Sequence, residues 1–290
     1  MNLRQLLEQL TIQFGEAGIE SARADAEVLV AEVLNLGRGE LAALAITDGE
    51  IAADSLTTVL ELAARRAARE PLQHLTGKAY FRNLALAVGK GVFVPRPETE
   101  LLAGLGVQAL VFAVDSGVEK PEAFDLATGS GAIALAMATE VPAATVHAVE
   151  LSEDAIAWTA KNFDTYRQQG AKLELRQGDL TDAFQDLNGT ADVVLSNPPY
   201  IPVDMIPIYP EVVLHDPGLA LYGGQDGLDL VRAASQSGLR LCKSGGFFAV
   251  EHADIQGPSV VELLKNDGWT QVTQHQDFNQ RDRVVSAVKA

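Results

Sequence analysis

The opening 70 residues of the chain show the apolar spacing of amphipathic helices. One face is formed by leucines at positions i, i+3, i+4 and i+7, namely Leu3, Leu6, Leu7 and Leu10. A second helix is predicted to begin with Ser21 as its N-cap, and Gly37 and Gly39 are predicted to end it. An alanine-rich third helix over 51–69 is predicted to stop before Pro71. This pattern predicts a small helical bundle. We find in it no set of residues whose types and spacing indicate catalysis.

The pattern changes after residue 75. Between 76 and 94, glycines separate short apolar runs, which is typical of a hairpin or a linker. After Pro121, runs of strand length alternate with helical stretches. Strands are predicted over 122–126, 144–149, 172–176, 191–196, 245–250, 269–275 and 282–288, and helices near 131–139, 153–168, 227–242 and 256–267. The alternation predicts a mostly parallel sheet with helices on both faces, whose last two strands form an antiparallel pair.

Composition narrows the class of protein. The chain has 290 residues, of which 47% are hydrophobic and 21% charged, enough to build the cores of two domains. No apolar run has the length of a membrane span and no signal-peptide core is present, so we expect a cytoplasmic protein. The net charge of −17 disfavours general nucleic-acid binding. The single cysteine, Cys242, excludes an internal disulfide and is predicted to be a buried apolar residue.

The first motif that indicates ligand binding is Asp125-Leu126-Ala127-Thr128-Gly129-Ser130-Gly131, where a predicted strand meets a predicted helix. Glycines allow a tight turn and a close approach of ligand to backbone, and the following helix offers free N–H groups. Glu150 ends the next strand, where a carboxylate can accept hydrogen bonds from both ribose hydroxyls. Together these features predict a ligand that contains a nucleoside, with NAD and S-adenosylmethionine both open.

Asp179 and Leu180 follow the third strand, where the acid could accept from an adenine amine and the leucine could pack on the ring. The pair is a weak signal, because Gly-Asp is a common turn.

The strongest motif is Asn197-Pro198-Pro199-Tyr200, directly after a predicted strand. Two prolines hold a loop rigid and leave its carbonyls free. The Asn197 side-chain oxygen and the Pro198 carbonyl can then accept both N–H bonds of a planar amide or amine, while Tyr200 stacks on its flat face. In a doubly wound sheet this loop and the glycine loop face each other across one crevice. The arrangement predicts transfer to a planar nitrogen, and no acid or base suited to hydride transfer is found.

Further motifs extend along the chain. They are Ala22-Arg23-x-Asp25-Ala26-Glu27, Pro71-Leu72-Gln73-His74-Leu75-Thr76-Gly77, Val94-Pro95-Arg96-Pro97-Glu98-Thr99-Glu100, Gly245-Gly246-Phe247, Glu251-His252 and Arg281-Asp282-Arg283-Val284-Val285. With the two loops above, they make nearly the whole chain resemble the peptide chain release factor N(5)-glutamine methyltransferases of the HemK/PrmC type. Adenine amino methyltransferases share the Asn-Pro-Pro-Tyr motif, so the Pro-Arg-Pro-Glu-Thr-Glu segment and the helical N-terminus narrow the resemblance.

The resemblance implies a fold and a division of the chain. The expected fold is α/β, a Rossmann-like class I S-adenosylmethionine-dependent methyltransferase with a seven-stranded, mostly parallel sheet and an antiparallel last strand, preceded by a small N-terminal helical bundle. The implied division is a helical substrate-recognition domain over 1–75, a β-hairpin linker over 76–94 and a catalytic domain over 95–290.

The resemblance also implies the activity, which is methylation of the glutamine amide nitrogen in the Gly-Gly-Gln motif of class I release factors. S-adenosyl-L-methionine would be the donor and S-adenosyl-L-homocysteine the product. Carried over by motif, the cofactor-binding residues are Asp125, Ala127, Thr128, Gly129, Ser130, Gly131, Glu150, Asp179, Leu180 and Asn197. The substrate-binding residues are Arg96, Asn197, Pro198, Pro199 and Tyr200, of which Asn197, Pro198 and Tyr200 are the catalytic ones. No metal is expected, and no histidine is nominated as a base.

Two departures from the family pattern and three alternatives remain. Ala127 stands where the family loop has its first glycine, which is compatible with the turn if its φ is negative, and Glu150 stands where aspartate is common. The substrate could be a glutamine of another translation protein, such as a ribosomal protein. An adenine amino methyltransferase is less favoured, because no basic run beyond Arg65-Arg66 is present. A non-catalytic nucleotide-binding protein would have no use for the substrate clamp. We expect a monomer with no stable nucleic-acid or membrane partner.

Overall fold

The computed structural model describes residues 2–47 and 49–290, and the chain divides into two compact units. Met1 and Asp48, within the predicted domain 1–75, lie outside the described residues. The smaller unit combines Met1–Lys78 with Pro207–His215, and the larger combines Ala79–Ile206 with Asp216–Ala290. The sequence did not foresee that 207–215 groups with the helical unit. The three-part division at residues 75 and 94 stays a prediction.

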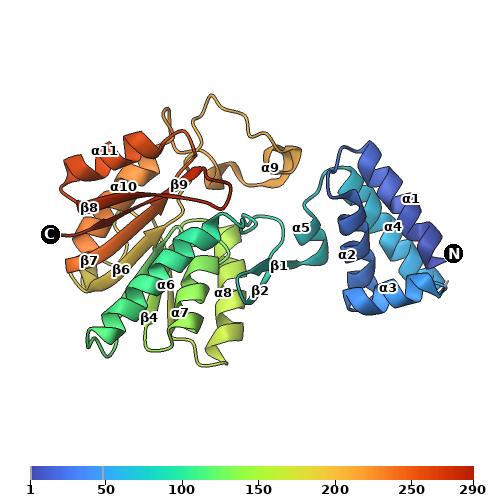
Figure 1. Cartoon of the computed structure of the whole chain (residues 1–290), viewed down its shortest axis with the longest axis horizontal. Coiled ribbons are helices and arrows are strands. Elements are labelled where there is room, and N and C mark those ends of the chain that lie inside the picture. Colours follow the sequence, from blue (N-terminus) through green and yellow to red (C-terminus); the bar gives the residue numbers. More distant parts are fainter. Residues whose placement is uncertain (1, 48) are drawn as a thin grey trace. The chain divides into compact units, whose positions relative to one another are not determined.

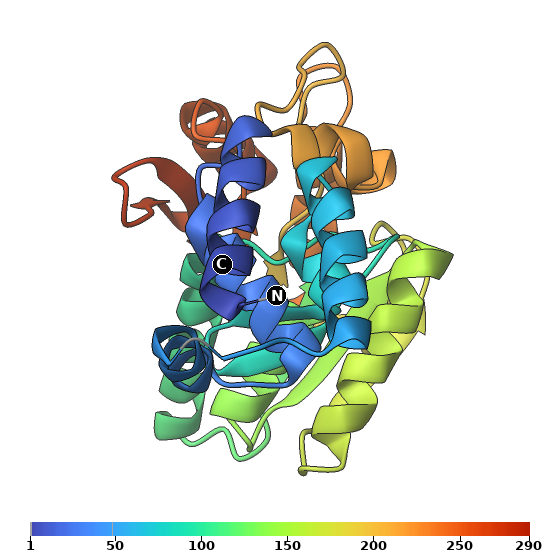
Figure 2. The same ribbon diagram turned by 90° about the vertical axis from the view of Figure 1, so that its right-hand side faces the viewer.

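The smaller unit is a bundle of helices (Figures 1 and 2). It contains α1 (Leu3–Glu16), α2 (Ala22–Leu34), α3 (Arg38–Ile46), α4 (Ala53–Ala67), α5 (Leu72–Thr76) and α9 (Pro210–His215). The four leucines of the predicted apolar face in α1 are all buried in its core. This burial confirms the amphipathic pattern, because the same side chains that recur at helical spacing are those removed from water.

Of two local predictions in this unit, the N-cap position of Ser21 is confirmed and the role of Gly37 and Gly39 needs correction. Ser21 occupies the N-cap position of α2, but its hydroxyl makes no capping bond and donates instead to Asp25 Oδ1 at 2.7 Å. The end of α2 is made by Asn35, which adopts a left-handed φ of 51° and bonds back to the last turn. Gly37 is the N-cap of α3, and Gly39 lies within that helix, so Gly39 does not act as a helix breaker.

A buried ionic cluster holds α9 within the helical unit. Arg66 donates to Asp25 Oδ2 at 2.8 Å and to Glu211 Oε1 at 3.0 Å, and Arg69 donates to Glu211 Oε2 at 2.6 Å. Removing one member of such a cluster leaves an uncompensated buried charge, which is strongly destabilising. The acidic residue of α9 is therefore tied to two arginines from the end of α4 and the turn after it.

The larger unit is built on a seven-stranded sheet of order β5-β4-β3-β6-β7-β9-β8. The strands are β3 (Glu122–Leu126), β4 (Thr145–Glu150), β5 (Leu173–Gln177), β6 (Ala191–Ser196), β7 (Cys242–Glu251), β8 (Thr270–Gln276) and β9 (Asp282–Val288). Strands β3 to β7 are parallel, and β9 runs antiparallel between β7 and β8. This topology confirms the predicted sheet. The predicted hairpin is a separate two-stranded sheet of β1 (Lys78–Phe81) and β2 (Leu84–Ala87).

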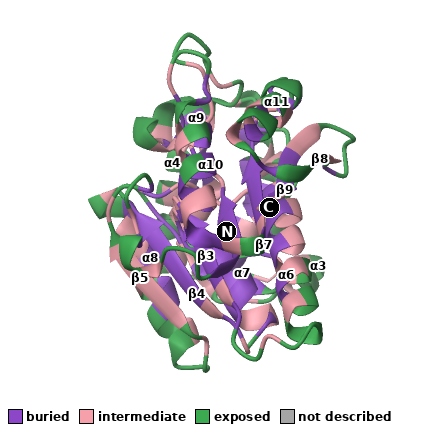
Figure 3. Cartoon of the chain, turned by 90° about the vertical axis from the view of Figure 1, so that its left-hand side faces the viewer, coloured by how far each residue is buried: buried purple, intermediate pink, exposed green. Residues whose placement is uncertain are grey.

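Helices cover both faces of this sheet, and the sheet itself is largely buried (Figures 1 and 3). One core contains side chains of α6 (Thr99–Asp115), α7 (Ala132–Glu140) and α8 (Glu153–Arg167), and the other contains those of α10 (Asp229–Leu241) and α11 (Gly257–Asp267). Neighbouring residues of one strand enter opposite cores: Val193 enters the first and Val194 the second. This is the period-2 alternation of a strand buried on both sides.

Two further predictions can be compared with the described residues. Cys242 is buried, and burial raises the pKa of its thiol to about 12, which confirms its role as a small apolar residue. Over residues 2–47 and 49–290, no helix is both long and apolar enough to cross a membrane.

Candidate active site

The sheet order creates a point where the chain changes direction. From β3 it runs outward through β4 and β5 on one side, and β6 and β7 lie on the other side. Ligands of doubly wound sheets bind at such a point, outside the carboxyl ends of the strands. An open cleft lies at this position and encloses about 1240 Å³, counting the part open to solvent.

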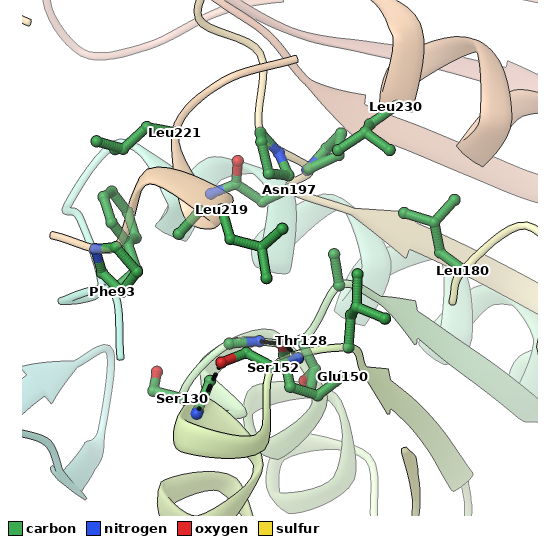
Figure 4. A pocket seen from close by; sticks show the side chains of 18 of the residues that line it. Phe93, Thr128, Ser130, Glu150, Ser152, Leu180, Asn197, Leu219, Leu221 and Leu230 are labelled. Carbon is green, nitrogen blue, oxygen red and sulfur yellow. Dashed lines mark hydrogen bonds between the residues drawn. The ribbon is translucent and has the colours of Figure 1, made fainter. Parts of the chain in front are cut away.

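The cleft brings together most of the predicted site. It is lined by Ala127, Thr128, Gly129, Ser130, Glu150, Asp179 and Leu180 from the predicted cofactor set, and by Arg96, Asn197, Pro198, Pro199 and Tyr200 from the predicted substrate set. Figure 4 shows Asn197 across the cleft from Thr128, Ser130 and Glu150. The two predicted loops therefore lie on opposite walls of one cavity. Asp125 and Gly131 do not line it.

Asp125 supports the glycine loop from behind. Its Oδ2 accepts hydrogen bonds from Thr128 Oγ1 at 2.6 Å and from Ala134 N at 3.0 Å. Burial raises the pKa of this carboxyl to about 7, although both hydrogen bonds lower it. Gly131 has a φ of 86°, and a Cβ there would lie 2.7 Å from a Phe163 ring carbon. Both residues shape the loop without facing the ligand space.

Ala127 adopts a left-handed backbone conformation. Its φ is 63°, so the condition under which alanine was expected to fit the turn, a negative φ, is not met. An L-residue in this region pays roughly 1–2 kcal/mol, because its Cβ approaches the following carbonyl oxygen. The next residue, Thr128, donates its N–H to Val149 O at 3.0 Å, which anchors the turn to β4. The loop therefore keeps a turn that suits glycine although it carries alanine.

Glu150 is held by two backbone N–H groups. Gly129 N donates to its Oε2 and Ser152 N to its Oε1, both at 2.8 Å. Burial raises the pKa of this carboxyl, and the backbone donors oppose the rise. Each carboxylate oxygen has a second lone pair, so Glu150 can still accept hydrogen bonds from two ribose hydroxyls.

Asp179 and Leu180 complete this wall of the cleft. Asp179 Oδ1 accepts from the N–H and the hydroxyl of Thr181, at 2.9 and 2.8 Å, which orients the carboxylate. Leu180 is nearly fully buried. A buried carboxylate at the end of one strand, another acid beside an apolar side chain, and a glycine loop are groups that suit a nucleoside-containing cofactor such as S-adenosylmethionine.

The opposite wall is built from side-chain hydrogen bonds. Asn197 Nδ2 donates to Thr99 Oγ1 at 3.2 Å, and the Tyr200 hydroxyl donates to Glu251 Oε1 at 3.2 Å. Burial, and next the negative charge of Glu251, raise the pKa of Tyr200. Gln256 Nε2 donates to the Tyr200 carbonyl at 2.9 Å and so holds the backbone of the same loop.

Sequence reasoning missed several residues of this wall. Thr99 and Glu251 lie within motifs that carried the resemblance, but no role was attributed to them. Gly223 packs against the loop so closely that a Cβ would lie 2.5 Å from the Pro199 carbonyl oxygen. The apolar lining is completed by Phe93, Leu219, Leu221 and Leu230 (Figure 4). The sequence offered no signal for these four, because they come from three stretches of the chain that carry no motif.

Arg96 and the histidines differ in their relation to the cleft. Arg96 lines it, stacks over the Phe93 ring at 4.8 Å and reaches Asp216 Oδ2 at 3.1 Å; its substrate-binding role stays a prediction. Among the described residues that line the cleft there is no histidine or cysteine. His147 instead bridges Glu122 and Glu174, at 2.7 and 2.8 Å. The arrangement can align a planar nitrogen, but it contains no imidazole to act as a base.

Comparison with known proteins connects both units to one family. Residues 5–77 match the family model described as the PrmC N-terminal domain, and residues 103–204 match the methyltransferase small domain. A release factor glutamine methyltransferase of Streptomyces coelicolor is 49% identical over 284 residues, which cover 97% of this chain and 96% of that protein.

Two other similar proteins carry different names. A 4-amino-L-phenylalanine/4-methylamino-L-phenylalanine methyltransferase of Streptomyces pristinaespiralis is 37% identical over 290 residues, which cover 99% of this chain and 95% of that protein. A solved structure, the hMettl16 catalytic domain in complex with the MAT2A 3′UTR hairpin 6, has a TM-score of 0.56 at 14% identity. It covers 79% of this chain and 82% of that one, and supports the methyltransferase fold alone.

Proposed function

This chain belongs to the family of release factor glutamine methyltransferases, and we propose that it methylates the glutamine of the Gly-Gly-Gln motif in class I peptide chain release factors. The methyl group would come from S-adenosylmethionine and would be received by the side-chain amide nitrogen. The observation that carries this proposal is the placement of Asn197 across one cleft from the glycine loop and Glu150. We expect a monomer that acts in the cytoplasm on a protein substrate.

The donor wall fits the proposed cofactor. The glycine loop, Glu150, Asp179 and Leu180 would hold S-adenosylmethionine through its ribose, adenine and backbone contacts. When bound, this cofactor supplies a methyl group already activated by a sulfonium. The task left to the protein is therefore alignment of the acceptor and electrostatic support of the developing charge.

The opposite wall would hold the glutamine. Because Asn197 Nδ2 is engaged by Thr99, the Oδ1 end of its amide is the end available to a donor from the substrate. Asn197 Oδ1 and the Pro198 carbonyl would accept the two N–H bonds of the substrate amide. An amide nitrogen is a poor nucleophile, because its lone pair is delocalised into the carbonyl. Acceptors that bind more tightly as positive charge develops on the nitrogen favour the transition state over the ground state.

The same reasoning removes the need for a strong base. The methylated nitrogen loses its proton readily after transfer, so no group has to abstract it first. The cleft lining, which holds neither histidine nor cysteine among the described residues, supports this account.

The test is transfer of label from S-adenosylmethionine to a purified bacterial release factor, compared with the same factor carrying alanine in place of the Gly-Gly-Gln glutamine. Label on the intact factor alone is the expected result. An intact factor that stays unlabelled, although the enzyme binds the cofactor, would overturn the proposed substrate. Ribosomal proteins and adenine-containing nucleic acid would then be assayed as acceptors.

A second candidate is favoured by the Streptomyces pristinaespiralis relative, whose name describes an aryl amine as its substrate. A clamp of two acceptors suits a planar aryl NH2 as well as an amide NH2, so the geometry serves both. Competition between a release factor and 4-amino-L-phenylalanine for labelled methyl distinguishes them. We expect transfer to the factor. Transfer to the small amine alone would replace the first proposal by the second.

A further inference from the structure

A chain of hydrogen bonds runs behind the Asn-Pro-Pro-Tyr loop to a single buried carboxylate. It starts at Asn197 Nδ2, which donates to Thr99 Oγ1 at 3.2 Å. The Thr99 hydroxyl in turn lies beside Glu251, at the end of β7, where as a donor it lowers the pKa of that carboxyl. The Tyr200 hydroxyl donates to Glu251 Oε1 at 3.2 Å. Two substrate-clamp residues from one loop therefore converge on the same acid of the neighbouring strand.

The carboxylate of Glu251 decides which group donates in each of these hydrogen bonds. An ionised carboxylate accepts hydrogen bonds and cannot donate them. Thr99 must therefore give its only hydroxyl hydrogen to Glu251, which leaves its oxygen lone pairs for Asn197. The Asn197 amide can satisfy that acceptor only with its NH2 group. Its carbonyl oxygen is then the end left for the cleft.

The orientation of this amide decides what the cleft can bind. The two ends of an asparagine side chain have nearly the same shape, so packing alone does not choose between them. With Oδ1 toward the cleft, Asn197 accepts from a substrate NH2. With Nδ2 toward the cleft, donor would face donor, and the substrate nitrogen would lose the contact that aligns it.

We propose that Glu251 is a positioning residue that sets the orientation of the Asn197 amide through Thr99 and holds the Tyr200 ring directly. Its side chain does not line the cleft. This inference rests on the proposed function, because it assigns a role in aligning the acceptor nitrogen. It adds two residues, Thr99 and Glu251, to the machinery on the substrate wall.

The burial of Glu251 lowers the stability of the folded chain. Its side chain is 1% exposed, and its Oε2 is buried without a hydrogen-bond partner in the described chain. An unsatisfied buried acceptor costs roughly 1–3 kcal/mol. Burial raises the pKa of Glu251 to about 7, with the Thr99 hydrogen bond and the Arg283 charge opposing the rise and Glu98 adding to it. Costs of this kind are concentrated where function requires them.

The main test is Glu251→Gln, which keeps the shape of the side chain but gives it an NH2 donor. A glutamine can donate to Thr99, which can then donate to Asn197 and turn its amide around. We expect kcat for methyl transfer to the release factor to fall roughly 100-fold. The affinity for S-adenosylmethionine should stay within about threefold, since the cofactor wall is untouched. The midpoint of thermal unfolding should stay equal or rise, because a buried charge has been removed.

A pair of Thr99 variants provides the matched control. Thr99→Val keeps the volume and removes the hydroxyl, so it should lower kcat about as much as Glu251→Gln. Thr99→Ser retains the hydroxyl and should keep at least about a third of the wild-type kcat. If Glu251→Gln fails to fold, the contrast between the valine and serine variants decides the proposal in its place.

The pH profile supplies a readout that a purely structural role would not move. Protonation of Glu251 adds a donor, as glutamine does, so wild-type kcat should fall as pH drops through about 7. This component should be absent from Glu251→Gln. Any fall on the acid side that persists in the variant belongs to other groups, such as Asp125 and Glu150, whose pKa values are also raised by burial. His252, adjacent in sequence, has its pKa lowered by burial.

The outcomes separate this proposal from the proposed function. If the wild-type enzyme does not methylate the release factor, the proposed function is wrong, whatever the variants do. A wild-type enzyme that methylates it, while Glu251→Gln or Thr99→Val keeps kcat within about threefold, overturns the positioning role alone. Loss of kcat with unchanged cofactor affinity and with serine rescue establishes it.

Discussion

Two buried glutamates, one on the cofactor wall of the cleft and one behind the substrate wall, are held in different ways. Glu150, on the cofactor wall, accepts from the backbone N–H groups of Gly129 and Ser152. Glu251, behind the substrate wall, accepts from the side-chain hydroxyl of Tyr200 and lies beside that of Thr99, which lowers the pKa of its carboxyl. Burial raises the pKa of both. Similar acids in similar surroundings are thus oriented by the backbone in one case and by side chains in the other.

The difference predicts how each wall responds to mutation. Backbone donors are present whatever residue occupies a position, so the cofactor wall depends mainly on backbone conformation and on its glycines. Side-chain donors disappear with a single substitution, so the substrate wall depends on the identity of a few residues. Mutations of the first wall should appear in stability and cofactor affinity, and those of the second in kcat.

The largest expected effect is on the substrate wall. Asn197→Ala removes the acceptor that aligns the substrate nitrogen, and kcat should fall roughly 100-fold or more. The unfolding midpoint should change little, because the loop is also held by Gln256 at the Tyr200 carbonyl. Single-turnover methyl transfer measures the loss. An unchanged rate would contradict the role of Asn197 in alignment.

The next effect concerns the acid of the cofactor wall. Glu150→Ala removes the acceptor of two backbone N–H groups together with the proposed ribose contacts, so the Kd for S-adenosylmethionine should rise on the order of 10–100-fold. Glu150→Gln keeps two hydrogen-bonding heavy atoms in place and should raise the Kd less. Calorimetric titration measures both values. If kcat at saturating cofactor fell as far as in Asn197→Ala, the two walls would not have the separate roles in cofactor affinity and in kcat that we infer.

A matched pair of glycines tests how far the cofactor wall depends on its backbone. Gly129 and Gly131 both have positive φ, 57° and 86°, but a Cβ at Gly129 meets nothing within 4 Å whereas one at Gly131 would meet the Phe163 ring at 2.7 Å. Gly131→Ala should therefore lose about 1–3 kcal/mol more stability than Gly129→Ala, in which only the backbone is strained. Urea denaturation of the two variants measures the difference. Equal losses would show that Phe163 moves aside.

The sequence predicted the architecture well because the architecture depends on periodicity. The apolar strands before the loops, from 122–126 to 282–288, follow from alternation and length, and β3, β6 and β9 begin and end where predicted. Motif spacing then places two loops at the carboxyl edge of a parallel sheet. Twelve of the predicted site residues line the cleft for that reason.

The sequence could not predict features that depend on contacts between distant segments. The bond between Asn197 and Thr99 joins residues 98 positions apart, and that between Tyr200 and Glu251 joins residues 51 positions apart. The place of 207–215 within the helical unit depends on Glu211 meeting two arginines from another part of the chain. The apolar pattern also could not predict the positive φ of Ala127. That angle is set by the hydrogen bond that closes the loop onto β4.

The smallest effect should come from that alanine. Ala127→Gly removes the strain of a left-handed Cβ, roughly 1–2 kcal/mol, but gives the unfolded chain more freedom, so the net gain should be about 0.5 kcal/mol. Ala132→Gly, in the first turn of α7, is the control and should lose about 1 kcal/mol, because glycine is a poor helix residue. Urea denaturation can distinguish a gain from a loss of this size in the free energy of unfolding. If Ala127→Gly lost as much stability as Ala132→Gly, the positive φ of Ala127 would carry no strain. The cofactor wall would then tolerate a side chain at a position whose backbone conformation favours glycine.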